Sequence, residues 1–478
     1  MNPQRGGRRY RSTSSQGWSN RQTYTVGPDL SQRASQIGSD LSRQASRVAK
    51  DLKPLAKSAL AGLRQALKLD TKPIKLPRRH RPDYLIPTLM IALAVIGFIT
   101  LFSIIPAITK GDSSESSSYM LKQLILLIAS LVAFAFANRV PLDVYRKFSF
   151  GVFLVGVILC LALPILGRMG VPGTLCALGA CRWYNIGIGT FQPAELLKLG
   201  SVLFMAGLFA TQASHGRIDT WDTVWRFLVV MAIDLLIVAG LQKDLGSGVA
   251  LAAILSLQLF VSGIDKKKLV IVGAIVLAMA VLAIVVAPHR MQRVMTFLGG
   301  GTEETDYHIN QAMVALGSGG LTGRGLGQSV QAFGWLPEAV NDSIFAIYGE
   351  MMGWIGVMVL ILLFGGLLYA IINKFDYIES YFLRMVVAGV FGWLAAHVLM
   401  NIGAMTHMIP LTGITLPLVS MGGTSMAFVM FALGVVFSIS HYTTYRRVDD
   451  KIDSGESNEN SMCWRRQRRT YNAHRSSH

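Results

Sequence analysis

Asp342 is a lone carboxylate at the start of a long apolar stretch, inside a glycine-rich region that covers residues 308–356. An acidic residue where a loop enters a membrane is costly unless it caps a helix, is paired or takes part in chemistry. A carboxylate near a hydroxyl group can act as a general base. The run Asn341-Asp342-Ser343 also suits a helix N-cap, and on the residues alone the cap is the stronger interpretation.

Other charged residues lie near the ends of neighbouring apolar stretches. Glu195 and Lys198 are three residues apart in FQPAELLKLG, so they share a helix face and either pair or shape a site. Asp244, in LQKDLGSG, is well placed to cap the helix that follows it. Arg290 and Arg293, in PHRMQRV, are either membrane anchors or ligand contacts.

The elements that must position these residues are apolar. The chain has 478 residues, of which 52% are hydrophobic and only 15% charged, which is less charge than a soluble protein of this length carries. Because lipid requires backbone groups to be satisfied within each segment, we predict an all-α polytopic membrane protein. Ten transmembrane helices are expected, at 84–109, 118–137, 149–167, 190–213, 226–241, 246–263, 268–287, 343–372, 382–405 and 414–440.

Lys and Arg predict the orientation, because they accumulate in cytoplasmic loops. With the N-terminus inside, the inner loops and flanks hold fifteen of them and the outer loops seven. Both termini are therefore expected in the cytoplasm. The large outer loop, 288–342, separates the seventh and eighth helices, and its glycines and apolar residues predict a packed or partly re-entrant loop.

In this orientation the charged residues named above all lie on the outer side. The helices that begin near residues 190, 343 and 414 also have their N-termini there, and helix N-termini attract anions. Cations together with helix N-termini suit a phosphate-bearing ligand whose carbon chain lies in the outer leaflet.

Basic charge is concentrated in the tails: residues 1–83 contain 18 Lys and Arg against 5 Asp and Glu, and residues 446–478 contain 8 against 5. These tails fit an anionic membrane surface, and no nucleic-acid-binding motif accompanies them. Three domains are expected: a basic cytoplasmic extension (1–83), partly disordered, a membrane domain (84–445) and a basic tail (446–478). Apolar residues at helical spacing over 30–69 indicate either a solvated helix or an amphipathic helix on the inner leaflet.

Two further features bear on chemistry. The histidines have no metal-ligand spacing, so no metal cage is expected. Cys176 and Cys181 share one short outer loop, where the sequence is compatible with a disulfide and with two free thiols.

Six blocks, in order and on a ten-helix background, resemble the SEDS glycosyltransferases of bacterial cell-wall synthesis, represented by FtsW and RodA. The resemblance covers about residues 84–440. The blocks are FQPAELLKL (191–199), QKDLGSG (242–248), the region of Arg290 and Arg293, ALGSGGLTGRGLGQS (315–329), LPEAVNDSIFAIYGEMMG (336–353) and NIGAMTHMIPLTGITLPLVSMGGTSM (401–426).

The resemblance implies a peptidoglycan glycosyltransferase that polymerises lipid II, a disaccharide-peptide on undecaprenyl pyrophosphate, at the outer face of the cytoplasmic membrane. Asp342 matches the family's essential acid, and it would be the general base toward the acceptor 4-hydroxyl. The glycine-rich segment before it would form a wall of the site. The residues expected to bind substrate are Arg290, Arg293, Glu195, Lys198, Asp244, Gln311 and Ser420.

The resemblance also implies a divalent cation, Mg or Mn, for which the sequence has no dedicated site. A class B penicillin-binding transpeptidase and other division proteins are the expected partners. The long basic extension favours an FtsW-like role in septal wall synthesis during cell division, at the septum, over a RodA-like role in elongation. A lipid II flippase and a catalytically inactive scaffold of the division machinery are the alternative functions.

The chain departs from the family pattern in four places. Gln331-Ala332 occupy the region where a Lys often precedes the LPE block, and Ser420-Met421-Gly422-Gly423 stand where the family often has Ser-Tyr-Gly-Gly. Val340-Asn341 stand where the family usually has His-Thr, directly before the acid. The loop before the fourth helix is GTLCALGACRWYNIG and keeps only Arg182-Trp183 of the usual pattern. These differences concern the surroundings of the site and the substrate variant more than the class of reaction.

Overall fold

The computed structural model describes residues 73–74, 76–77, 79–109, 111–177, 180–187, 189–285, 288–297 and 303–444, all within one compact unit. The predicted helix over 30–69 and the basic tail lie outside the described residues. The three predicted domain boundaries therefore remain predictions.

Each predicted apolar segment contains a helix. The first seven correspond to α2 (Leu85–Ile108), α3 (Ser113–Arg139), α4 (Leu142–Arg168), α5 (Pro193–Ser214), α6 (Trp221–Leu235) with the π-helical turn η1 (Leu236–Leu241), α7 (Leu245–Val261) and α8 (Lys266–Val285). The last three are α11 (Ile344–Ile372), α12 (Tyr381–Met405), which the short η2 (Phe375–Tyr377) precedes, and α13 (Gly423–Ser440).

The described part of the chain contains nine helices that are long and apolar enough to cross a membrane, and α7 is a shorter apolar helix of 17 residues. The predicted class, an all-α polytopic membrane protein, is confirmed. The count of ten spans and the orientation remain predictions.

The last segment and the long loop differ from expectation. The segment 414–440 is helical only from Gly423, because the residues before it form a loop that returns to the cavity described below. The loop 288–342 contains two helices, α9 (Pro288–Phe297) and α10 (Glu303–Ser318), and α10 packs against α11. A small antiparallel sheet, β1 (Thr174–Ala177), β2 (Ala180–Asn185) and β3 (Thr190–Phe191), is an element that the sequence did not predict.

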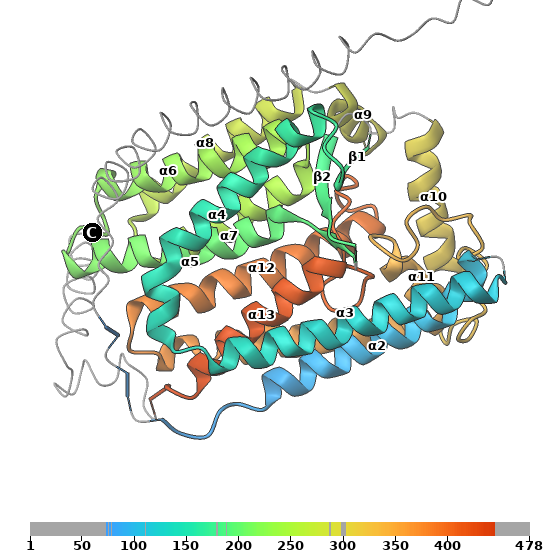
Figure 1. Cartoon of the computed structure of the whole chain (residues 1–478), viewed down its shortest axis with the longest axis horizontal. Coiled ribbons are helices and arrows are strands. Elements are labelled where there is room, and N and C mark those ends of the chain that lie inside the picture. Colours follow the sequence, from blue (N-terminus) through green and yellow to red (C-terminus); the bar gives the residue numbers. More distant parts are fainter. Residues whose placement is uncertain are drawn as a thin grey trace, which may run out of the picture. The chain divides into compact units, whose positions relative to one another are not determined.

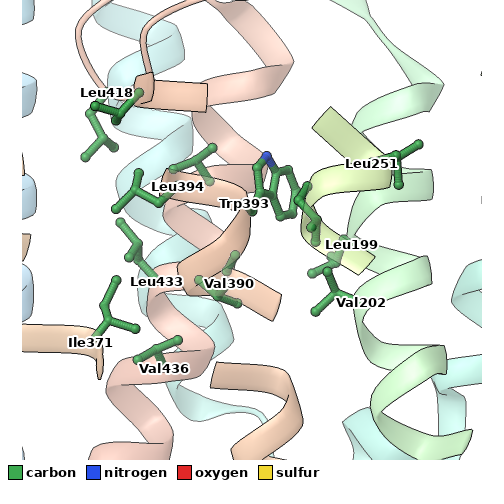
Figure 2. Close-up of a cluster of buried hydrophobic side chains, with 14 of the residues drawn as sticks. Leu199, Val202, Leu251, Ile371, Val390, Trp393, Leu394, Leu418, Leu433 and Val436 are labelled. Carbon is green, nitrogen blue, oxygen red and sulfur yellow. The ribbon is translucent and has the colours of Figure 1, made fainter. Parts of the chain in front are cut away.

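Helices α5 and α12 are the innermost of the bundle. In the most apolar 18-residue stretch of each helix, 94% of the residues of α5 and 78% of those of α12 are buried. Around them, α4 packs on α5, α7 on α12, α3 on α13 and α2 on α11 (Figure 1). Trp393 of α12 is fully buried, and Figure 2 shows it facing Leu199 of α5, with Leu394 of its own helix on its other side. The site residues on these two central helices are therefore surrounded by closely packed neighbours.

Two glycines bring helix backbones into close contact. A Cβ added at Gly200 of α5 would lie 2.7 Å from the Cα of Phe153 in α4. A Cβ at Gly434 of α13 would lie 2.5 Å from the main-chain oxygen of Phe134 in α3. Because lipid provides no hydrophobic driving force between helices, such close packing is what stabilises their association.

The segment before α2 joins several helix ends at the side of the bundle away from the cavity. Asp83 pairs with Lys374, which follows α11, at 2.6 Å. The Nε2 of His80 lies 2.8 Å from the oxygen of Thr443, which follows α13. Residues 79–83 are thereby fixed to the ends of two membrane helices.

Candidate active site

A polar cavity of about 600 Å³ lies where four helices begin. Its wall includes Gln192 and Glu195 at the start of α5, residues 244–247 at the start of α7, Asp342 just before α11, and residues 422–425 at the start of α13. Helix N-termini carry partial positive charge and unpaired N–H groups. Three of these N-termini were predicted to share one side of the membrane, and α7 adds a fourth.

Five of the eight predicted site residues line this cavity: Glu195, Lys198, Asp244, Arg293 and Asp342. Gln311 lies on α10, outside the lining set, and is only partly buried. Ser420 is buried beside the cavity, where its Oγ accepts a hydrogen bond of 2.8 Å from the N–H of Leu416. The side chain of Arg290 lies outside the described residues.

Asp342 is 9% exposed, and its Oδ1 has no hydrogen-bond partner among the described residues. Burial raises the pKa of Asp342 to about 7, the negative charge of Glu338 adds to this effect, and Arg293 opposes it. The N-cap of α11 is Ser343, so the interpretation of Asp342 as the N-cap is wrong. A carboxylate that exchanges a proton near neutral pH inside a cavity has the properties of a general base.

The main chain around Asp342 is held from two sides. The side chain of Asn401, buried on α12, donates hydrogen bonds of 2.7 Å to the main-chain oxygens of Asp342 and Ile414. The N–H of Met421 donates to the oxygen of Val340 at 2.8 Å. The acid is therefore fixed to α12 and to the loop before α13.

Asn341 has a separate structural role. Its Nδ2 donates to the carboxylate of Glu338 at 2.6 Å. Glu338 also lines the cavity, with a left-handed backbone at φ 51°. In the unusual dipeptide, Val340 thus connects the main chain before Asp342 to the loop before α13, and Asn341 holds the carboxylate of Glu338.

Lys198 occupies the centre of a buried group of three charged or polar side chains. Its Nζ lies 2.6 Å from Glu195 Oε1 and 3.1 Å from His397 Nε2, and all three residues line the cavity. The predicted pairing of Glu195 with Lys198 is confirmed. His397 was missed, because it lies on α12, 199 positions further along the chain, with no spacing that connects it to α5.

The cavity wall contains polar atoms without partners. Glu195 Oε2 and Thr412 Oγ1, like Asp342 Oδ1, are buried and make no hydrogen bond within the described part of the chain. Buried polar atoms are normally bonded. A polar ligand in this cavity could satisfy all three.

Asp244 caps α7, as predicted: its Oδ1 accepts from the N–H of Ser247 at 3.1 Å. Its Oδ2 accepts from Gln192 Nε2 at 3.3 Å. Both carboxylate oxygens are therefore engaged by the protein, at the ends of α5 and α7.

The glycine-rich segment contributes to the wall of the site only through its last residues, Glu338 and Asn341. Residues 315–331 do not line the cavity but pack on α11. The buried carboxylate of Glu350 accepts from Ser329 Oγ and from the N–H groups of Val330 and Gln331, at 3.0 and 3.2 Å for the latter two. Gly323 has φ 81°, and a Cβ there would overlap the oxygen of Met351. A Cβ at Gly319 would likewise overlap the main-chain oxygen of Gly349, so these two glycines allow the close approach to α11.

Comparison with known proteins identifies the family. Residues 83–445 match the FtsW/RodA/SpoVE model, which describes a cell cycle protein. The chain belongs to this family. The match covers all of the helices and the whole cavity wall, and it bears out the resemblance drawn from the six sequence blocks.

Relatives in the FtsW/RodA/SpoVE family align over most of their length. A probable peptidoglycan glycosyltransferase FtsW from Thiomicrospira cyclica is 32% identical over 74% of this chain and 90% of its own length. Stage V sporulation protein E of Bacillus subtilis is 30% identical over 77% of this chain and 99% of its own length.

Solved structures have the same fold. A chain from a structure that describes coordination of polymerization and crosslinking by a peptidoglycan synthase complex has a TM-score of 0.61, with 22% identity over 75% of this chain and 97% of that chain. The rod shape determining protein RodA of Thermus thermophilus has a TM-score of 0.55, with 22% identity over 76% of this chain and 98% of the RodA chain.

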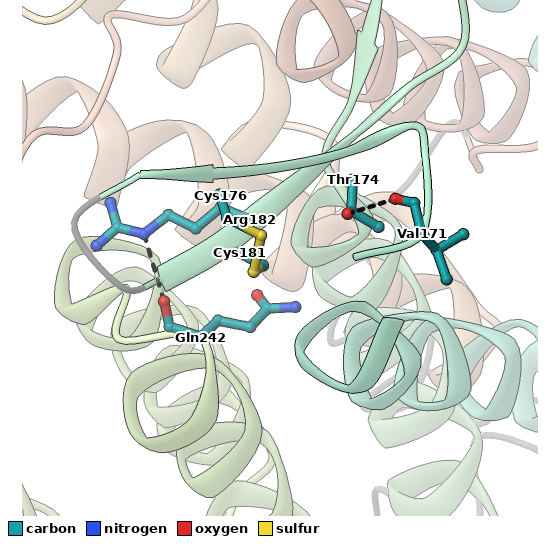
Figure 3. Close-up of a disulfide and its surroundings, with 6 residues drawn as sticks. All are labelled: Val171, Thr174, Cys176, Cys181, Arg182 and Gln242. Carbon is teal, nitrogen blue, oxygen red and sulfur yellow. Dashed lines mark hydrogen bonds between the residues drawn. A yellow bond between two sulfur atoms is a disulfide. The ribbon is translucent and has the colours of Figure 1, made fainter. Parts of the chain in front are cut away.

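The loop in which this chain departs most from the family pattern is a disulfide-closed hairpin. Cys176 and Cys181 form a disulfide, which settles the alternative that the sequence left open, and they are paired residues of β1 and β2. Arg182, next to Cys181, donates to the main-chain oxygen of Gln242 at 3.3 Å (Figure 3). It also donates to the main-chain oxygen of Lys243 at 2.7 Å. The hairpin and the turn before α7 are thereby joined into one side of the cavity.

The side chains of the cavity do not fit a metal site built from protein ligands alone. Within the described ranges, no three His, Cys, Asp or Glu side chains gather closely enough to hold a metal ion. The divalent cation therefore stays a prediction from family resemblance, and the reaction described below has no step through it.

Proposed function

We propose that this chain is a peptidoglycan glycosyltransferase that polymerises lipid II at the outer face of the cytoplasmic membrane. The observation that carries the proposal is Asp342, a buried carboxylate with a pKa of about 7 and an unpartnered oxygen, in a polar cavity among membrane helices. The names of the FtsW relatives support the choice of reaction.

In the proposed reaction, Asp342 takes the proton from the 4-hydroxyl of the acceptor N-acetylglucosamine. The oxygen attacks the anomeric carbon of the donor glycan and forms the new glycosidic bond. The bond from that carbon to the phosphate oxygen breaks, and undecaprenyl pyrophosphate leaves with the electron pair. The proton stays on Asp342 until solvent removes it.

Negative charge grows on the diphosphate during this step. The N-termini of α5, α7, α11 and α13 meet at the cavity, and oriented N–H groups stabilise such charge without reorganisation. Arg293 lies in the same wall, where its guanidinium donates to the oxygen of Leu411 at 3.1 Å. These groups favour departure of the leaving group.

We further propose that the protein acts in the inner membrane at the division septum, together with a class B transpeptidase and other division proteins. Several relatives are named FtsW. One solved structure with a similar fold describes the coordination of polymerization and crosslinking by a peptidoglycan synthase complex. A RodA-like role in elongation predicts localisation along the side wall instead, which fluorescent fusions in dividing cells would distinguish.

The test uses the full chain in liposomes with labelled lipid II and a partner transpeptidase, with strand length measured on a gel. We expect wild type and Asp222→Asn, a matched change of an exposed aspartate in α6, to make strands. Asp342→Asn should bind lipid II but make no strands. The same assay with EDTA, followed by Mg²⁺ or Mn²⁺, tests the cation.

Three outcomes would contradict this function. A flippase would transport lipid II at a measurable rate in Asp342→Asn liposomes. An inactive scaffold would support growth as Asp342→Ala. Wild-type protein that binds lipid II but makes no strands beside its transpeptidase would also exclude the polymerase.

A further inference from the structure

Among the described cations of the cavity wall, Lys243 is the one whose side chain the protein does not engage. Its side chain is exposed and lines the cavity, and no ion pair or hydrogen bond engages its ammonium group within the described residues. The other cations are committed. Lys198 is paired with Glu195, Arg293 donates to Leu411, and Arg182 donates to two carbonyl oxygens.

The backbone of Lys243 is strained. Its φ is 55°, in the left-handed region that residues with a Cβ rarely occupy. Such a conformation is unfavourable and persists only where the surroundings impose it. Strain of this kind is concentrated at functional sites, so the side chain it presents needs a reason.

The surroundings do impose it. On one side, Arg182 donates to the main-chain oxygens of Gln242 and Lys243. On the other, the side chain of Gln242 donates to the oxygen of Cys160 in α4 at 3.2 Å, and the N–H of Asp244 donates to the oxygen of Val238 at 3.0 Å. The turn is therefore held by α4, by η1 and by the hairpin.

The disulfide fixes the residue that holds the turn. Arg182 follows Cys181 directly, and the disulfide packs on the end of α4, where a Cβ at Gly167 would overlap both sulfur atoms (Figure 3). A disulfide restricts the conformations of the loop it closes. The hairpin therefore acts as a rigid clamp that sets the position of the Lys243 main chain.

We propose that Lys243, presented by this clamp, binds the diphosphate of the lipid-linked substrate, an inference that rests on the proposed function. The neighbouring Asp244 forms no ion pair with it within the described residues, and both of its carboxylate oxygens accept hydrogen bonds from other groups. A lysine ammonium is a compact point charge that suits phosphate oxygens. Its contribution increases as the bond from the anomeric carbon to the phosphate oxygen breaks and charge develops there.

The binding test compares the purified full chain with Lys243→Asn. Asparagine tolerates the left-handed backbone and removes the charge, so the turn is retained. The probes are farnesyl diphosphate, farnesyl monophosphate, farnesol and a soluble muropeptide that has carboxylates but no phosphate. Lys267→Asn, at the start of α8, is the control.

We expect Lys243→Asn to weaken farnesyl diphosphate binding at least tenfold, to weaken monophosphate binding less, and to leave farnesol binding unchanged. Lys243→Arg should restore most of the affinity. Loss of the disulfide, by reduction or by the double substitution Cys176→Ser and Cys181→Ser, should weaken diphosphate binding by the otherwise wild-type protein. In Lys243→Asn the same loss should have little further effect, because the disulfide acts through the Lys243 ammonium group.

Equal binding of the diphosphate by wild type and Lys243→Asn would overturn the inference. Equally weakened binding of all three farnesyl probes would also overturn it, because that result indicates a structural defect. Weakened binding of the muropeptide alone would overturn it too, because Lys243 would then bind a carboxylate. Failure of the proposed function is distinct: the diphosphate would then bind in a Lys243-dependent manner while wild type makes no glycan strands.

Discussion

Asn401 donates a hydrogen bond of 2.7 Å to the main-chain oxygen of Asp342, although 59 residues separate the two in the chain. The same amide group donates to Ile414 at 2.7 Å, so one buried side chain connects the acid to the loop that faces it. The position of the carboxylate therefore depends on α12, one of the two most buried helices of the bundle.

Replacement of Asn401 by Ala should lower kcat for polymerisation about tenfold to a hundredfold, because a small displacement of a catalytic group is costly. The KM for lipid II should change much less. Steady-state kinetics on folded, monodisperse protein provide the measurement, and Asn373→Ala, at the far end of α11, is the control. Unchanged kcat per folded molecule would show that Asn401 has no positioning role.

The rate should depend on pH through Asp342. A base must be deprotonated, and the pKa of Asp342 is about 7, so kcat/KM should rise about tenfold between pH 6 and pH 8. Because the charge of Glu338 raises that pKa, Glu338→Gln should move the midpoint to lower pH. Glu115→Gln, at the exposed start of α3, should not. A flat profile in wild type would exclude Asp342 as the base.

Stability should have the opposite pH dependence. The folded pKa of Asp342 is raised from 3.8 to about 7, so the folded state binds the proton more tightly than the unfolded state does. The resulting stability is complete below pH 3.8 and is lost as pH rises through 7, to a total of about 4 kcal/mol. Asp342→Asn should remove this loss, so its melting temperature should exceed that of wild type at pH 8 and approach it at pH 5. Equal pH dependence in both proteins would contradict the raised pKa.

Glu350 should matter for stability rather than for chemistry. Its buried carboxylate accepts three hydrogen bonds from residues 329–331, and Glu350→Ala leaves those donors without partners. We expect a loss of about 2–4 kcal/mol in the free energy of unfolding and faster proteolysis within 319–331. Glu115→Ala provides the comparison for an exposed glutamate. Normal stability with lost polymerisation would instead give Glu350 a direct role in the reaction.

Features set by neighbouring residues were predictable from the sequence. Apolar runs identified the long apolar helices of the described residues, the three-residue spacing identified the Glu195–Lys198 pair, and the position of Asp244 identified a helix cap. Each of these depends on contacts within about one helical turn.

Features set by tertiary contacts were not predictable. His397 reaches Lys198 from another helix, and the partners of Asn341 and Val340 depend on how the loop folds back. On the residues alone Asp342 suits a helix N-cap, whereas the structure places Ser343 at that position. The glycine-rich segment precedes the acid in the sequence, but only its last residues, Glu338 and Asn341, line the cavity, whereas Gly319 and Gly323 contact α11.

The cavity wall begins at Leu175 and is complete only at Ser425, at the start of the last membrane helix. During synthesis, Glu195, Asp244 and Asp342 all leave the ribosome before the loop and helix that close the space around them. A chain that stops after α12 would contain every predicted acidic residue and no finished site. The cavity can therefore form only after α13 has been made and has packed into the bundle.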